Sequence, residues 1–321
     1  MPLSPYGEPL HGKRQLLLVE WSTLAYTLLT LLLLLFHWQQ IHTPWLLLEG
    51  RAFVLGGMVL LWLIYVARPN RYSLLLRYLF PLTLLGYWYP DTYEFCQLLP
   101  NLDHFFAQAD LTLFGTQPSI AFSQWLPQKL WSELFHMGYF AYYPLILLTL
   151  LAPLLQRRPE LFGRTAFVVL ASFFLYYTIY LFLPVAGPQY YFQAVGFDVI
   201  QSAHFPHLFD YFRSHTELAP SPGPEGFFRS LVESTQQSGE RPTAAFPSSH
   251  VGMSTVLLLL LRHNRQRWLL LGMLPFYFFL CCATVYIQAH YLIDVFGGLV
   301  TALCFYALTS WFWQKWVEAK G

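Results

Sequence analysis

Long apolar stretches recur along the whole chain and limit its fold more than any other feature. They cover residues 16–36, 52–67, 74–89, 132–155, 165–184, 247–261, 268–287 and 291–313. Several approach the roughly 20 residues that an α-helix needs to cross a bilayer. Charged residues make up only 11% of the sequence, whereas an average soluble domain contains about 25%. We therefore predict an all-α, polytopic integral membrane bundle of about eight transmembrane helices.

The distribution of Lys and Arg predicts the orientation of the chain, because cytoplasmic loops are enriched in both residues. With the N-terminus inside, most of them fall on the cytoplasmic side: Lys13, Arg14, Arg68, Arg71, Arg77, Arg157, Arg158, Arg164, Arg262, Arg265, Arg267, Lys315 and Lys320. The other side receives Arg51, Lys129, Arg213, Arg229 and Arg241. This pattern predicts that both termini are cytoplasmic.

Two long segments outside the apolar stretches fall on the extracytoplasmic side. Residues 90–131 mix acidic and aromatic residues, as helices that lie in the membrane interface do. Residues 185–246 are polar and rich in Pro and Gly. A loop of this length without an evident fold is commonly either functional or disordered.

Asp294 is the most informative acidic residue, because a carboxylate at the end of an apolar stretch is costly to bury. It follows His290 by four residues, so the two side chains share one face of a helix. The carboxylate can accept the Nδ1 proton of the imidazole and leave Nε2 as a nucleophile or base. The alternative is a pair that merely satisfies a buried acid at a helix start.

The sequence PSSH (247–250) begins the sixth apolar stretch on the same membrane side as His290 and Asp294. A helix that starts near Ser248 directs unpaired N–H groups and its positive dipole end outward, which suits an anion. Two histidines, an aspartate and two serines on one membrane face fit phosphoryl transfer. Alone, the serines could simply cap the helix.

These residues resemble motifs of the type 2 phosphatidic acid phosphatase (PAP2) superfamily. FPSSH (246–250) resembles its P-S-G-H motif, and HYLID (290–294) resembles the H-x-x-x-D end of its third motif. The resemblance implies a six-helix core in which His290 attacks phosphorus, forms a phosphohistidine and is held by Asp294. It also implies that His250 protonates the leaving group. Ser248, Ser249 and neighbouring amides would hold the phosphoryl oxygens.

The resemblance covers about residues 80–300 and implies a division of the chain. Residues 1–72 form an N-terminal pair of transmembrane helices without a motif. Residues 73–321 form the PAP2-like catalytic membrane domain, in which 90–131 is the interfacial segment and 185–246 is the extracytoplasmic active-site loop.

Two of the superfamily's basic motif positions are not basic in this chain. Its Lys-x6-Arg-Pro motif has no match, and Thr284 stands where an Arg usually lies six residues before the third-motif histidine. The inositol phosphorylceramide synthase branch and similar bacterial proteins resemble the chain better. The matching segments are FLPVAGPQY (182–190), LFGTQPS (113–119), YFAYY (139–143) and TVYIQAHYLIDV (284–295). In the first of them Gln189 occupies a position that often holds Arg, so we expect it at the phosphate.

The shortage of basic residues bears on the substrate. A phosphomonoester carries about −1.5 to −2 charge near pH 7, whereas a phosphodiester carries about one. Arg241 is the best candidate to replace the missing cations, before Arg213 and Arg229. We predict a lipid head-group phosphotransferase that takes a phospholipid or lipid phosphate donor and a lipid alcohol acceptor. A lipid phosphate phosphatase with water as acceptor is the alternative, and a non-catalytic lipid-binding protein is another.

We expect no cofactor, no metal and no nucleic-acid partner. His204, His207 and Asp210 have a spacing that could bind a metal, but this spacing is common outside a fixed helix. Glu133 and His136 share a helix face, and we expect them to form interhelical hydrogen bonds. The chain has no Asn-x-Ser/Thr glycosylation site, which favours a bacterial plasma membrane with an extracytoplasmic active site.

Overall fold

A computed structural model gives the fold of residues 4–10 and 12–320. All regular elements in these ranges are helices. The long ones are α1 (Leu18–Phe36), α2 (Pro44–Ala67), α3 (Arg71–Thr83), α4 (Leu85–Cys96), α7 (Lys129–Phe140), α8 (Tyr142–Leu155), α9 (Phe162–Phe182), α13 (Ser249–His263), α14 (Arg267–Tyr286) and α15 (Leu292–Lys320). The shorter ones are α5 (Asp103–Phe114), α6 (Pro118–Trp125), α10 (Pro188–Val195), α11 (Phe197–Gln201), α12 (Phe227–Gly239), η1 (Pro159–Leu161) and η2 (Tyr211–Arg213).

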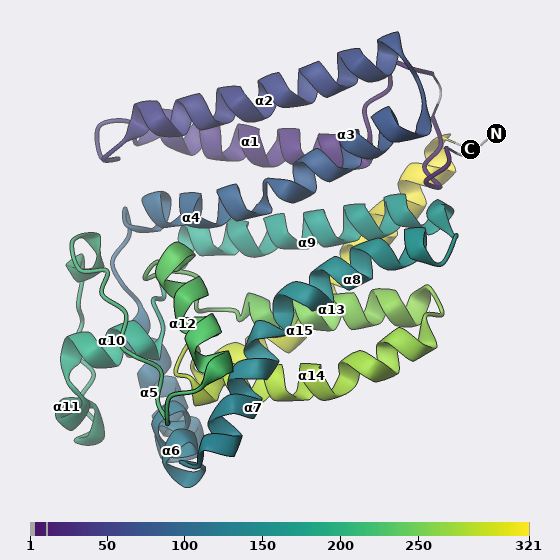
Figure 1. Ribbon diagram of the computed structural model, residues 1–321. Coiled ribbons are helices and arrows are strands. Elements are labelled where there is room, and N and C mark those ends of the chain that lie inside the picture. Colours follow the sequence, from purple (N-terminus) through teal and green to yellow (C-terminus); the bar gives the residue numbers. More distant parts are fainter. Residues whose placement is uncertain (1–3, 11, 321) are drawn as a thin grey trace.

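Helix α9 lies at the centre of the bundle. It packs against α1, α3 and α4 on one side and against α8, α13 and α15 on the other (Figure 1). Of its apolar spanning window, 72% is buried, whereas α2 at the edge is 17% buried. Helix α2 packs on α1 and α3, so most of its surface is left for lipid.

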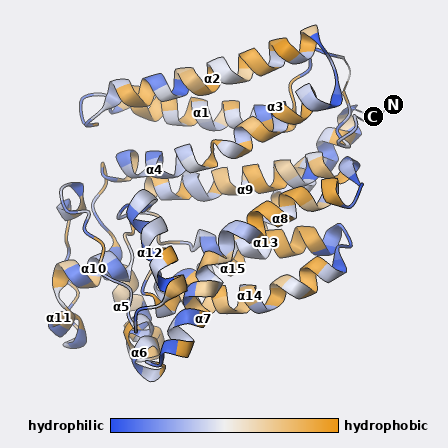
Figure 2. Cartoon of the chain, viewed as in Figure 1, coloured by the Kyte–Doolittle hydropathy of each residue, from blue (hydrophilic) through white to orange (hydrophobic). Residues whose placement is uncertain are grey.

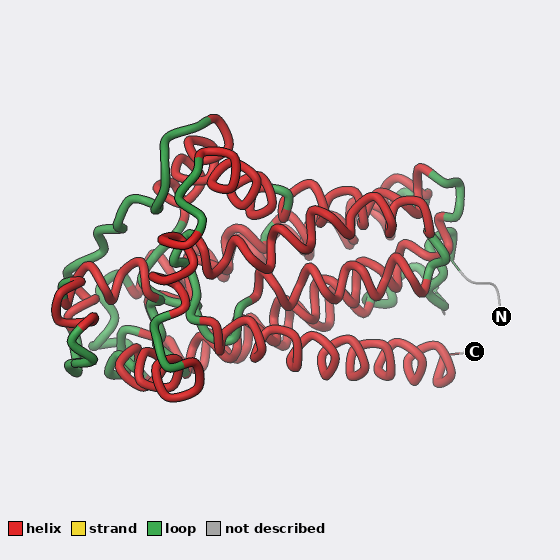
Figure 3. The backbone as a smooth tube through the Cα atoms, turned by 90° about the horizontal axis from the view of Figure 1, so that it is seen from below, coloured by secondary structure: helices red, strands yellow, loops and turns green. Residues whose placement is uncertain are grey.

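The two ends of the bundle differ. The short helices α5, α6, α10, α11 and α12 gather at one end, and both chain ends lie at the other (Figures 1 and 3). The long helices carry most of the hydrophobic residues, while hydrophilic residues concentrate at the two ends (Figure 2). The segments 90–131 and 185–246 therefore form a helical cap on one end of the bundle.

The expected eight spans are confirmed only in part. Within the described residues, six segments are long and apolar enough to cross a membrane: 18–36, 44–67, 129–155, 159–182, 267–286 and 292–320. The third apolar stretch is divided at Leu84 into α3 and α4, and the sixth forms α13, which has only 15 residues. Helix α13 is buried along most of its length, so its hydrophobicity reflects protein packing as much as contact with lipid.

Arg51 and Arg77 were expected among loop cations and instead lie inside helices. Arg51 of α2 forms a paired hydrogen bond with Asp91 of α4, with both N···O distances at 2.7 Å. Arg77 of α3 pairs in the same way with Glu20 of α1. All four side chains are buried, and a buried arginine requires such a partner. These two pairs therefore fix the N-terminal helices rather than orient the chain.

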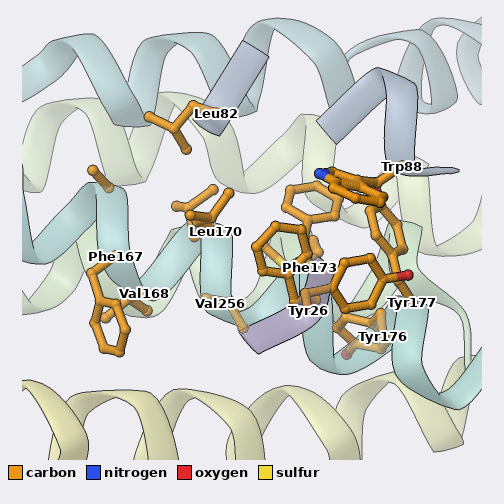
Figure 4. Packing of buried hydrophobic residues seen from close by; sticks show 14 of the residues in the cluster. Tyr26, Leu82, Trp88, Phe167, Val168, Leu170, Phe173, Tyr176, Tyr177 and Val256 are labelled. Carbon is orange, nitrogen blue, oxygen red and sulfur yellow. The ribbon is translucent and has the colours of Figure 1, made fainter. Parts of the chain in front are cut away.

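Aromatic packing joins α1 to the rest of the bundle. The Tyr26 ring of α1 meets the Trp88 ring of α4 edge-on, at 5.1 Å between centroids, and stacks on Phe174 of α9 at 4.5 Å. Tyr177 lies beside them (Figure 4). The N-terminal helices thus share one hydrophobic core with the motif-bearing helices.

Candidate active site

Two glycines allow α13 and α15 to approach closely. A Cβ atom on Gly298 of α15 would lie 2.6 Å from the carbonyl oxygen of Ser248, and one on Gly252 of α13 would lie 3.0 Å from the carbonyl oxygen of Gly298. Small residues at a helix contact let two backbones come together in a membrane. This contact places the N-terminal ends of α13 and α15, and hence both motifs, side by side.

His290 lies in the short connection between α14 and α15 and is almost fully buried. Its backbone N–H donates to the carbonyl of Thr284 at 2.9 Å. Its Nδ1 atom lies 2.8 Å from the carbonyl oxygen of Ala245, which makes Nδ1 the protonated nitrogen. The main chain of His290 is therefore tied to the end of α14, and its ring is held by a backbone carbonyl from a distant segment.

Asp294 is the nearby carboxylate but does not accept the Nδ1 proton as expected from the sequence. Its Oδ2 atom lies 3.6 Å from Nδ1 of His290 and accepts the backbone N–H of Tyr291 at 2.9 Å. The reason is that α15 begins only at Leu292, so His290 is not on the helix that the i, i+4 spacing assumes. Asp294 caps the start of α15 and places a carboxylate beside the imidazole.

Burial determines the charge of the free His290 side chain. Removal from water lowers the pKa of His290 to about 4, although the hydrogen bond to Ala245 opposes this shift. The imidazole is therefore neutral at pH 7. With Nδ1 donating to Ala245, the Nε2 lone pair is available to attack an electrophile.

His250 is the second residue of α13 and lies between two tyrosine rings. The centroids of Tyr139 and Tyr142 are 4.4 and 4.5 Å from that of His250. The His250 and His290 rings meet edge-on with centroids 5.8 Å apart. The structure thus brings the two motif histidines together.

His250 and His290 line a common pocket, which has an empty volume of about 380 Å³ with its open mouth included. Its other polar lining comes from Ser249, three tyrosines (Tyr89, Tyr139 and Tyr190), Gln189, Glu240, Arg241 and Thr243. These residues come from α4, α7, α10, the segment after α12 and the start of α13. The segment 185–246 therefore supplies much of the pocket wall.

The two motif serines have different positions. The Ser248 hydroxyl is fully buried and accepts the N–H of Val251 at 3.4 Å, so it caps α13 and does not line the pocket. Ser249 lines the pocket beside His250. The first turn of α13, with the positive end of its dipole, is thus adjacent to the pocket.

Gln189 lines the pocket, but its amide is already engaged. Its Nε2 donates to the carbonyl of Ala219 at 2.5 Å, and its Oε1 accepts from Gln236 at 3.2 Å. The side chain therefore holds the segment after α11 against α10 and α12. Gln189 can therefore form with a ligand only the hydrogen bonds that these two contacts leave open.

Arg241 is the only Lys or Arg that lines the pocket among the described residues. The two other candidates lie elsewhere. Arg213 donates to the carbonyl of Gln97 at 2.7 Å, and Arg229 pairs with Glu233 at 2.9 Å. The pocket therefore has a single permanent cation, in agreement with the missing basic motif residues.

Glu240 is a pocket residue that the sequence analysis missed. Its Oε1 accepts a hydrogen bond from the Tyr139 hydroxyl at 3.1 Å. Burial raises the pKa of Glu240 to about 7, although the hydrogen bonds from Tyr139 and Gln236 act to lower it. Its position beside Arg241, just upstream of PSSH, was the available clue.

Two further carboxylates support the site without lining it. Asp103 of α5 accepts the backbone N–H groups of Ala186 and Gly187 at 2.6 and 2.7 Å and the Tyr291 hydroxyl at 2.9 Å. It thus joins the VAGPQ turn to the residue after His290.

Asp110 lies two turns further along α5. It accepts the backbone N–H groups of Leu292 and Ile293 at 2.8 and 3.0 Å, so it caps α15 from outside. Burial raises the pKa of Asp110 to about 6, against the effect of these two bonds. Two acids seven residues apart, on one face of a helix, were the clue in the sequence.

The remaining candidates lie outside the pocket. The described residues contain no group of three or more His, Cys, Asp or Glu side chains that could hold a metal. His204, His207 and Asp210 therefore do not form a metal site in this structure. Glu133 accepts the backbone N–H groups of Phe228 and Arg229 at 3.0 and 3.2 Å and so caps α12. This is the interhelical role expected for it. His136 does not share this role, because its Nδ1 atom lies 2.7 Å from the carbonyl oxygen of Ser132 in the same helix.

Comparison with known families adds a sequence relationship to this geometry. The model of the PAP2 superfamily matches residues 107–308, which include His250, His290 and Asp294. No curated protein and no solved structure matches the chain.

Proposed function

Because this chain belongs to the PAP2 superfamily, we propose that it is a membrane enzyme that transfers a lipid phosphate or phospho-head group through His290. One observation carries the proposal. His290 and His250 line one pocket with ring centroids 5.8 Å apart, and the Nδ1 atom of His290 is held by Ala245. The Nε2 lone pair of this pocket-lining histidine is therefore available to attack phosphorus.

In the proposed first step, Nε2 of His290 attacks phosphorus and the bond from phosphorus to the leaving lipid oxygen breaks. His250, which takes up a proton when the anionic phosphate binds beside it, gives that proton to the leaving oxygen. The first-turn amides of α13, Ser249 and Arg241 hold the phosphoryl oxygens. In the second step His250 takes a proton from the acceptor hydroxyl, whose oxygen attacks phosphorus. The P–N bond then breaks and His290 is restored. Asp294 stabilises the positive charge that His290 carries between the two steps.

The single cation favours a phosphodiester donor, and hence head-group transfer. A phosphomonoester brings up to two negative charges, whereas the pocket offers Arg241 beside the carboxylate of Glu240. The chain also has the segments that resemble inositol phosphorylceramide synthases, including FLPVAGPQY (182–190). We therefore favour a lipid alcohol as acceptor and treat water as the competing acceptor.

We further propose that the pocket opens on the extracytoplasmic side of a bacterial plasma membrane. The elements that line the pocket, among them α10 and the start of α13, lie at the capped end of the bundle, away from both chain ends (Figure 1). The basic residues predict that the chain ends are cytoplasmic. Donor and acceptor would then enter from the outer leaflet.

The test uses purified protein in lipid vesicles that contain a labelled phospholipid, with and without diacylglycerol or ceramide. Mass spectrometry of the products distinguishes a new phospholipid, which supports transfer, from a released phosphorylated head group, which shows that water is the acceptor. The variant His290→Ala should abolish both products. The matched control is His204→Ala, because His204 is exposed and lies outside the pocket. EDTA should leave the rate unchanged, and full activity of His290→Ala would overturn the proposal.

A further inference from the structure

Glu240 is an acidic residue inside a pocket that we assign to a phosphate group. It directly follows α12 and lines the pocket together with His250 and His290. Its carboxylate is fixed by the Tyr139 hydroxyl at 3.1 Å, and the Tyr139 ring stacks on His250. The carboxylate therefore has a defined place next to the reacting groups.

The surroundings of Glu240 offer little compensation for its charge. The titratable and charged groups around it are Tyr89, Tyr139, Tyr143 and Tyr190, the two histidines and Arg241. The tyrosines are neutral hydrogen-bond donors, and Arg241 is exposed. Arg241 donates to the backbone carbonyl of Glu240 at 3.0 Å, and no ion pair joins its guanidinium to the Glu240 carboxylate among the described contacts.

A carboxylate in this place discriminates between donors by their charge. Like charges repel more strongly in a pocket that is partly shielded from water, and a specific site commonly excludes a wrong ligand by such a repulsive group. A dianionic phosphomonoester either meets the ionised Glu240 or requires it to take up a proton. A monoanionic phosphodiester has half the charge, and Arg241 can balance it.

We propose that Glu240 is the residue that excludes phosphomonoesters and restricts the donor to lipid phosphodiesters. This inference rests on the proposed function of the pocket and names the class of its substrate. It assigns a role in specificity to a residue outside both sequence motifs.

The test compares Glu240→Gln with the unchanged enzyme at pH 8, with a phosphatidic acid and a phospholipid diester of the same acyl chains. The amide oxygen of the substituted side chain can still accept from Tyr139, so the variant removes charge and keeps shape. We expect the ratio of kcat/KM for the monoester to that for the diester to rise about tenfold or more, the size of effect of one nearby like charge. Glu217→Gln is the matched control, because Glu217 is exposed and outside the pocket.

A ratio that stays unchanged or falls in folded Glu240→Gln would overturn the inference. Thermal unfolding of the variant reports whether it is folded. If the variant is not folded, inhibition of the unchanged enzyme provides the test. The monoester should inhibit diester turnover about tenfold more weakly than a non-reacting diester analogue does. Equal inhibition by the two compounds contradicts the inference. These outcomes are separate from failure of the proposed function, in which His290→Ala would keep full activity on either donor.

Discussion

The Nδ1 atom of His290 lies 2.8 Å from the carbonyl oxygen of Ala245. This hydrogen bond joins the motif at the start of α15 to the end of the long segment that precedes α13. It fixes the tautomer in which Nδ1 carries the proton and Nε2 carries the lone pair. In the proposed mechanism, a main-chain carbonyl therefore orients the nucleophile, and Asp294 supplies negative charge at 3.6 Å.

Replacement of Asp294 by Asn tests this division of roles. The amide oxygen can still accept the N–H of Tyr291, and Ala245 still orients His290, so we expect a folded protein. The lost charge no longer stabilises the charged phosphohistidine, and kcat should fall about 10²–10³-fold. The drop should be smaller than the roughly 10⁴-fold loss that follows when the tautomer itself is lost. Steady-state kinetics measures the loss of kcat, and Asp198→Asn, at an exposed position, is the control. An undiminished kcat in Asp294→Asn would contradict the proposed role of the Asp294 charge.

The contact between α13 and α15 is tested by Gly298→Ala. The added Cβ would lie 2.6 Å from the Ser248 carbonyl oxygen, so the two helices must move apart. We expect a loss of about 1–3 kcal/mol in the free energy of unfolding and a lower rate, because the motif histidines separate. Gly272→Ala is the matched control, since its Cβ meets nothing within 4 Å. Equal stability and activity of the two variants would disprove the role of this contact.

The pH dependence of kcat/KM reports the ionisation of the free enzyme. Protonated His290 cannot attack phosphorus, so activity requires pH above its pKa. Burial lowers this pKa to about 4, so the rate should persist as pH falls through 6.5, the ordinary value for histidine, and be lost near 4. We would measure the profile in Glu240→Gln, where position 240 does not titrate. An acid limb near 6.5 would show that His290 is not buried as described.

Arg241 should act mainly in binding of the donor. It is the single Lys or Arg that lines the pocket among the described residues, and a hydrogen bond to a charged group contributes about 1.5–3 kcal/mol. We expect Arg241→Ala to raise KM for the donor about 10–100-fold. Arg213→Ala should leave KM unchanged, because Arg213 binds Gln97 outside the pocket. A larger increase in KM for Arg213→Ala than for Arg241→Ala would show that Arg241 does not bind the donor.

The sequence predicted the long helices well, because hydrophobic stretches and helix-start residues are local patterns. It did not predict α10, α11 and α12, which lie within the polar segment 185–246 that was expected to be a loop. Each of the eight apolar stretches corresponds to helix in the structure. Local patterns do not reveal whether a stretch faces lipid or protein, and α13 is the example. Its 15 residues are mostly buried by α8, α9, α14 and α15.

The site was predictable where its residues form short motifs and hidden where they act across the chain. His250, His290 and Arg241 meet in one pocket, as the motifs and the topology suggested. Asp110 was missed because its partners are backbone N–H groups at positions 292 and 293, which no local pattern identifies. Ala245 was missed for the same reason, since it acts through its main chain.

The most direct measurement is the identification of the covalent intermediate. The enzyme is mixed with a labelled phospholipid, stopped in alkali, which preserves phosphohistidine, and digested for mass spectrometry. We expect a phosphorylated or phospho-head-group adduct on the peptide that contains His290, absent from His290→Ala and retained in His204→Ala. Turnover with the adduct on another residue, or undiminished turnover in His290→Ala, would contradict it.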